Sequence, residues 1–206
     1  MYYILAAIPV VLIPFMGTTW LIFSIYLVLL ANKSRLSKIR WHPSCGFIFK
    51  LFLIFLVSGL VLEVLAIIDN LPLPPGDRIL LHPDPLTDLY LAIGYYAGFA
   101  LVWSVVVSKI RFSHRDVFIL GGTFGILFEQ TGKLLFTLQI PAWFYVFLVY
   151  GSFQAIPLVI ASEYLENLDR KDIGTGMKIL VGIAVEIGCI LLAALFLWIL
   201  KYPLGI

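Results

Sequence analysis

Residues 47–68 read FIFKLFLIFLVSGLVLEVLAII, and this stretch points most directly to a fold class. It contains two charged residues, Lys50 near its start and Glu63 in its second half. An α-helix rises about 1.5 Å per residue. A run of roughly 20 apolar residues is therefore long enough to cross the hydrocarbon layer of a bilayer. The sequence predicts a membrane-spanning helix at this position.

The composition of the whole chain supports the same interpretation. Of its 206 residues, 62% are hydrophobic and 13% are charged. Soluble domains are roughly 45–50% apolar and about 25% charged. A soluble core of this size has no room for the excess apolar surface, whereas lipid accepts it. We predict one all-α integral membrane domain over residues 1–206, with the lipid bilayer as its surroundings.

Five other stretches are long and apolar enough to span a membrane. The six predicted spans cover residues 3–31, 47–68, 88–108, 116–138, 141–162 and 177–200. The first is expected to be a retained span, because its apolar run is longer than the roughly 7–15 residues of a signal-peptide core. Ser113 and Asp116 have capping-box spacing before the fourth span. Pro141 suits the first turn of the fifth.

The loops differ in basic charge, and this predicts the orientation. Eleven Lys and Arg residues lie in or beside loops one, three and five, against two on the other side: the eleven are Lys33, Arg35, Lys38, Arg40, Lys50, Lys109, Arg111, Arg115, Arg170, Lys171 and Lys178. Short cytoplasmic loops carry the excess of Lys and Arg. We therefore expect a multi-pass cell-membrane protein with loops one, three and five in the cytoplasm and both termini outside.

Four charged residues lie well inside the predicted spans, away from the first turns, namely Glu63, Glu129, Lys133 and Glu186. Such residues are costly in lipid and usually face the interior of the helix bundle. Glu129 is close to the predicted midplane, and Lys133 follows on the same helix face. Gly121 and Gly125 extend this face, so it is expected to pack against another helix or to line a cavity.

A glycine precedes each of the three glutamates by four residues, at Gly59, Gly125 and Gly182. Residues four apart lie on one helix face, and a small residue lets a neighbouring helix approach closely. The pattern predicts helix packing beside each carboxyl group. If the three faces converge, the carboxyls form a chain of the kind that relays protons. Two alternatives stay open, a structural Glu129–Lys133 ion pair and separate, locally bonded carboxyls.

These residues favour a small proton- or ion-coupled membrane transporter, with Glu129 as central carrier, Glu63 and Glu186 as flanking steps and Lys133 as a modulating charge. One alternative is an intramembrane enzyme acting on a lipid or prenyl substrate, although no catalytic residues can be assigned. Another is a non-catalytic membrane subunit or assembly factor, either as a homo-oligomer or with a membrane partner.

Other classes of ligand are not expected. The acidic residues of the proline-rich segment 69–87 lack diagnostic ligand spacing, so we expect no metal site and no cofactor. The net charge of +2, without a basic face carrying stacking aromatics, argues against nucleic acid.

Overall fold

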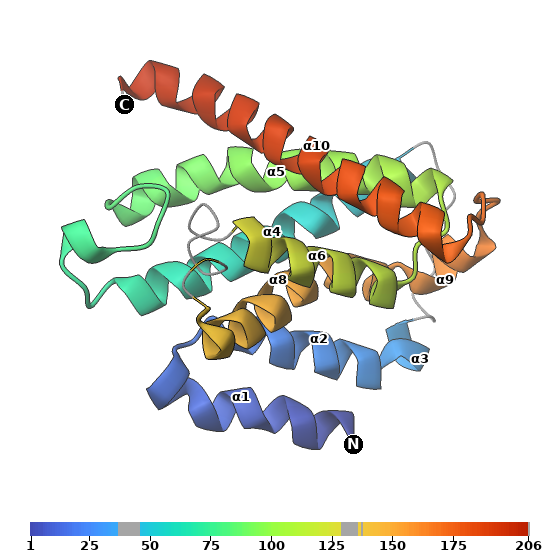
Figure 1. Ribbon diagram of the computed structural model, residues 1–206, viewed down its shortest axis with the longest axis horizontal. Coiled ribbons are helices and arrows are strands. Elements are labelled where there is room, and N and C mark those ends of the chain that lie inside the picture. The colour runs from blue at the N-terminus through green and yellow to red at the C-terminus, as the bar shows by residue number, and fades with distance from the viewer. Residues whose placement is uncertain (37–45, 129–135, 137, 206) are drawn as a thin grey trace.

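The computed structural model describes residues 1–36, 46–128, 136 and 138–205 (Figure 1). Among them, four helices are long and apolar enough to cross a membrane: α4 (Phe47–Asn70), α5 (Pro85–Lys109), α8 (Ile140–Ile160) and α10 (Thr175–Lys201). They coincide with the second, third, fifth and sixth predicted spans. As long apolar helices, these four predictions are confirmed to within a few residues at each end.

The prediction of one helix over residues 3–31 is wrong. The chain forms two antiparallel helices, α1 (Tyr2–Met16) and α2 (Leu21–Ala31), which pack side by side (Figure 1). The turn begins at Gly17, whose φ of 83° and ψ of 174° define a conformation essentially restricted to glycine. The turn could not be seen in the apolar run, because hydropathy indicates whether a segment lies in lipid or in water and does not indicate where the chain reverses direction.

The carboxylate of Asp69 at the end of α4 holds this turn in place. It accepts hydrogen bonds from the backbone N–H and the hydroxyl of both Thr18 and Thr19. The first N–H groups of a helix lack intrahelical partners, and here a distant carboxylate satisfies those that precede α2. Ser24 Oγ donates to Ala6 O at 2.7 Å and joins the two helices.

The hairpin also corrects the expected position of the N-terminus. Figure 1 shows the N-terminus at the end of the bundle where α3 (Lys33–Leu36) lies, and the C-terminus at the opposite end. The two termini were expected on one side because a single first span would carry the chain across once. Two antiparallel helices return it to the side on which it began.

The fourth predicted span, residues 116–138, is described only in part. Helix α6 (His114–Phe128) forms its first half, and residues 129–135 and 137 lie outside the described residues. The predicted capping box is confirmed: Ser113 N donates to Asp116 Oδ2 at 2.8 Å, and Asp116 N donates to Ser113 Oγ at 3.1 Å. Leu138, with a φ of 51°, lies in the turn before α8.

Helix α8 is the centre of the bundle. It packs against α2, α4 and α6, and α5 packs between α4 and α10. In its most apolar window 67% of the residues are buried, against 33% in α4 and 28% in α10. Most residues of the outer helices α4 and α10 therefore lie on the outside of the bundle. The remaining short elements are α9 (Ser162–Asn167), η1 (Pro75–Asp77) and η3 (Tyr202–Leu204).

Candidate functional site

Glu186 of α10 has the most deeply buried glutamate side chain in the described part of the chain, at 1% exposed. Gln154 Nε2 of α8 lies 3.5 Å from Glu186 Oε2. The indole of Trp103 on α5 lies near the same carboxyl. Each of these three side chains has a buried atom without a hydrogen-bond partner within the described residues: Glu186 Oε1, Gln154 Oε1 and Trp103 Nε1. Buried polar groups are normally paired, so this group of atoms points to a site that accepts water, a proton or an ion.

A small cavity of about 50 Å³ borders Glu186 and Gln154. It lies among α5, α6, α8 and α10, and its other walls include the aromatic side chains of Tyr95, Phe99, Phe124, Phe128 and Tyr150. A water molecule in the liquid occupies about 30 Å³, so the cavity holds about one or two waters. It is too small for an organic ligand, since such pockets measure roughly 300–1,000 Å³.

Glycines create the space that this site needs. A Cβ atom at Gly121 would come within 2.6 Å of the side-chain carbonyl of Gln154, so only glycine lets that amide lie across α6. A Cβ at Gly125 would lie 2.7 Å from the ring of Tyr150. At Gly182 it would overlap the side chain of Leu120. The structure thus places these three glycines at close approaches between helices.

A second buried carboxyl lies on α4. Glu63 is 7% exposed, and Tyr96 of α5 donates its hydroxyl to Glu63 Oε2 at 2.9 Å. The ring of Tyr96 lies against Gly59, where a Cβ would overlap it. The four-residue spacing therefore has a local explanation at this position. The glycine makes room for the aromatic ring, and the hydroxyl at the end of that ring reaches the carboxyl one turn further along.

Two neighbouring residues of α5 lie near the two described glutamates. Tyr96 binds Glu63, while Tyr95 lines the cavity beside Glu186, and the two rings meet edge to face at 5.1 Å between centroids. Glu129 and Lys133, the predicted centre of the site, lie outside the described residues. Convergence of all three carboxyls on one pathway therefore stays a prediction.

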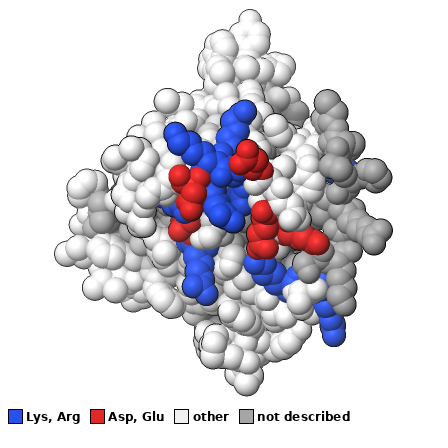
Figure 2. Space-filling view, turned by 90° about the vertical axis from the view of Figure 1, so that its right-hand side faces the viewer, with Lys and Arg blue, Asp and Glu red and all other residues white. Residues whose placement is uncertain are grey.

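A larger cavity lies at the end of the bundle where α3, the segment before α6 and the residues around α9 come together. Figure 2 shows this end, with basic side chains gathered near its middle and acidic ones among them. The cavity measures about 610 Å³, and its wall includes five cationic side chains: Lys33, Arg111, Arg115, Arg170 and Lys178. In the sequence, these residues indicated only the orientation of the chain in the membrane. Their gathering around a cavity is a tertiary feature that loop charge does not reveal.

The acidic and histidine side chains do not form a metal centre in the part of the chain that the structure describes, because no three His, Cys, Asp or Glu residues there are grouped closely enough to hold an ion. In the proline-rich segment, Asp84 instead caps α5 by accepting from Thr87 N at 2.8 Å, and Asp88 accepts from His82 N at 3.1 Å. Both carboxylates thus accept hydrogen bonds from backbone N–H groups of this segment and of the start of α5.

The fold and the composition together define a class: a polytopic helical membrane protein embedded in a lipid bilayer. Comparison with known protein families, curated proteins and solved structures found no match to this chain.

Proposed function

We propose that the protein is a small membrane transporter in which the buried carboxyl group of Glu186 takes up and releases a proton. The observation that carries the proposal is the state of this carboxyl. It is almost fully buried, it forms no ion pair within the described residues, and one of its oxygens is unpartnered beside a cavity of water size. Burying an unpaired carboxylate costs several kcal/mol. The gain or loss of a proton by Glu186 therefore changes the stability of the arrangement of side chains around it.

The arrangement of α10 supports access to this carboxyl from the basic end. Lys178, Gly182 and Glu186 recur at intervals of four and share one helix face. Lys178 lines the large cavity and Glu186 lines the small one. Leu120 of α6 packs across Gly182 between them. In this proposal, movement of α6 against α10 opens and closes the connection between the two cavities.

The remaining carboxyls are proposed as further steps. Glu63 carries a hydroxyl partner from Tyr96, and a carboxyl–hydroxyl pair is able to pass a proton. Glu129 is proposed as the step between Glu186 and Glu63, with Lys133 as a charge that modulates it. This order follows the predicted depths of the three residues in their spans.

Proton flux into liposomes tests the proposal. Purified protein is reconstituted with a pH-sensitive dye inside the vesicles, and a potassium gradient with valinomycin drives proton entry. We expect wild-type protein to acidify the lumen and Glu186→Gln, which keeps shape and removes the titratable proton, to reduce the rate at least tenfold. Glu163→Gln is the matched control, because Glu163 is exposed.

Two results would contradict the proposal. One is a Glu186→Gln variant that melts like wild type and still carries protons at the wild-type rate. The other is wild-type flux no greater than that of protein-free vesicles. A change in thermal unfolding common to both glutamine variants would show a general effect of lost charge, so the melting temperature of each variant is measured beside its flux.

A further inference from the structure

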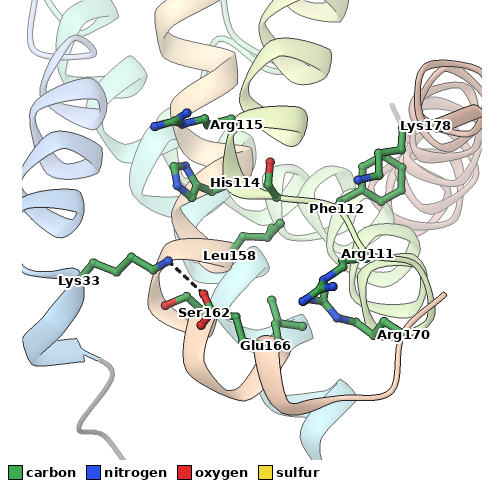
Figure 3. A pocket seen from close by; sticks show the side chains of 12 residues that line it. Lys33, Arg111, Phe112, His114, Arg115, Leu158, Ser162, Glu166, Arg170 and Lys178 are labelled. Atoms are coloured by element: carbon green, nitrogen blue, oxygen red, sulfur yellow. Dashed lines mark hydrogen bonds and ion pairs between the residues drawn. The ribbon is translucent and has the colours of Figure 1, made fainter. Parts of the chain in front are cut away.

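The cavity at the basic end is built by segments far apart in the chain. Lys33 comes from α3, Arg111 from the segment before α6, and Arg170 from the segment after α9 (Figure 3). The floor is apolar and includes Leu158 and Leu165. A volume of about 610 Å³ is within the range of pockets that hold an organic ligand.

A backbone pairing places two arginines side by side. Ile110 and Lys171 form an isolated parallel bridge, in which Arg111 N donates to Lys171 O at 3.0 Å and Lys171 N donates to Lys109 O at 2.9 Å. Arg111 and Arg170 are the neighbours of the bridged residues, and Figure 3 shows their side chains meeting at one wall of the cavity. Burial and the nearby Arg111 both lower the pKa of Arg170, which is the effect expected when two positive charges lie close together.

The cationic charge of the cavity is only partly balanced. Lys33 pairs with Glu166 at 3.1 Å, and Lys178 pairs with Asp172 at 3.4 Å and with Asp116 at 3.8 Å. Within residues 1–36, 46–128 and 138–205, Arg111, Arg115 and Arg170 form no ion pair. Three guanidinium groups at one cavity therefore have no acidic oxygen within 4 Å among the described residues, and the nearest acidic influence on Arg170 is Glu166, which also pairs with Lys33.

Two buried donors at the same cavity are also unsatisfied. Ser162 is 7% exposed and its Oγ has no hydrogen-bond partner in the described part of the protein. The same holds for Nε of Arg170, whose Nη1 donates to Val107 O at 3.2 Å. Buried donors are normally paired with an acceptor. A ligand with acceptor oxygens in the cavity would give both donors a hydrogen-bond partner.

Membrane orientation alone does not explain this arrangement. The excess of Lys and Arg in cytoplasmic loops requires only that the charges lie on one side of the bilayer, where exposed side chains spread apart in water. Paired guanidiniums, an unsatisfied serine hydroxyl and an apolar floor are additional features. Paired guanidiniums match the oxygens of a phosphate, which accepts two parallel N–H bonds from each arginine.

We propose that this cavity binds a phosphate group attached to an organic body, with Arg111 and Arg170 holding the phosphate and the apolar floor contacting the rest of the ligand. The phosphate belongs either to the headgroup of an anionic lipid in the adjacent leaflet or to a soluble phosphate ester. Basic pockets between membrane helices bind such headgroups. The proposal does not require proton transfer at Glu186.

Binding of inorganic phosphate to the purified protein in a neutral detergent is the first test. We expect phosphate to raise the melting temperature relative to chloride at equal ionic strength, and calorimetry to give a saturable isotherm. Arg111→Gln and Arg170→Gln should each weaken binding at least tenfold. Arg35→Gln is the matched control, because Arg35 is exposed at the same end and does not line the cavity.

Lipid discs distinguish the two sources of phosphate. In discs of phosphatidylcholine alone, a site for soluble esters keeps the detergent affinity, and adding phosphatidylglycerol changes nothing. A headgroup site gives a higher melting temperature with phosphatidylglycerol and competition between that lipid and inorganic phosphate. Phosphate binding that is absent in detergent together with no effect of phosphatidylglycerol overturns the proposal. So does binding that both cavity variants retain. Arg111 is exposed, so its variant stays informative if Arg170→Gln fails to fold.

Discussion

Replacing Gly17 with alanine distinguishes the helical hairpin from a single first span. The two structures predict changes of opposite sign in the free energy of unfolding. In the hairpin, Gly17 has a φ of 83° and a ψ of 174°, and an alanine Cβ would lie 2.6 Å from Asp69 Oδ2. In one continuous helix, the same change would replace a poor helix former with the best one. That replacement stabilises a helix interior by about 0.5–1 kcal/mol.

The expected loss in the hairpin follows from two contributions. Holding a non-glycine residue in this backbone region costs about 1–3 kcal/mol. Displacing the Asp69 carboxylate sacrifices at least one charge-assisted hydrogen bond from Thr18 or Thr19, worth about 1.5–3 kcal/mol. The lower conformational entropy of the unfolded alanine variant offsets about 0.4–1 kcal/mol of this destabilisation. The net destabilisation is about 2–5 kcal/mol, which is a fall of roughly 4–20 °C in melting temperature for a chain of this length.

Thermal unfolding of the detergent-purified variant measures this change. Gly76→Ala is the matched control, because Gly76 lies in the loop between α4 and α5, a Cβ added there would have no atom within 4 Å, and its φ is not positive. The control is expected to melt within about 2 °C of wild type, as is usual for a surface substitution. A Gly17→Ala protein that melts at or above the wild-type temperature would refute the hairpin and restore the single span.

Three other measurements probe the topology, the helix packing and the basic end. A tag at the N-terminus and a tag in the loop between α5 and α6 are expected on one side of the membrane, with a C-terminal tag on the other. Protease protection in sealed vesicles checks this, and N- and C-terminal tags on one side would contradict the fold. Gly59→Ala is expected to lower stability by about 1–3 kcal/mol in thermal unfolding, because its Cβ overlaps the ring of Tyr96. Gly188→Ala, whose nearest neighbour lies at 3.8 Å, should be neutral or stabilising, and equal melting of the two variants would refute the packing argument. Burial and the charges of Lys33 and Arg115 lower the pKa of His114, so the unfolded chain binds this proton more tightly and the folded state loses stability as the pH falls below about 6.5. Lys33→Gln should raise the pKa of His114 in an NMR titration, and an unchanged value would remove Lys33 as a cause.

The candidate site was predictable to a limited extent. Glu63 and Glu186 stand out in sequence because charge is costly inside an apolar run, and the structure buries both. Their pairing with Tyr96 and Gln154 was not predictable, since each partner lies on another helix. The arginines beside the large cavity were visible only as loop charges. Their pairing depends on the bridge between Ile110 and Lys171, which brings together segments 61 positions apart in the chain.

Local properties of the chain were enough to indicate that it lies in a membrane and to locate four long helices. The length of an apolar run and the composition can be read from consecutive residues alone. Where the chain reverses, which helices meet and where charges gather depend instead on the assembled bundle. The turn at Gly17 needs Asp69, which is 52 positions further along the chain, to satisfy the N–H groups that the turn exposes. Contacts of this kind are settled by competition among packings of the whole chain, so no window of consecutive residues contains them.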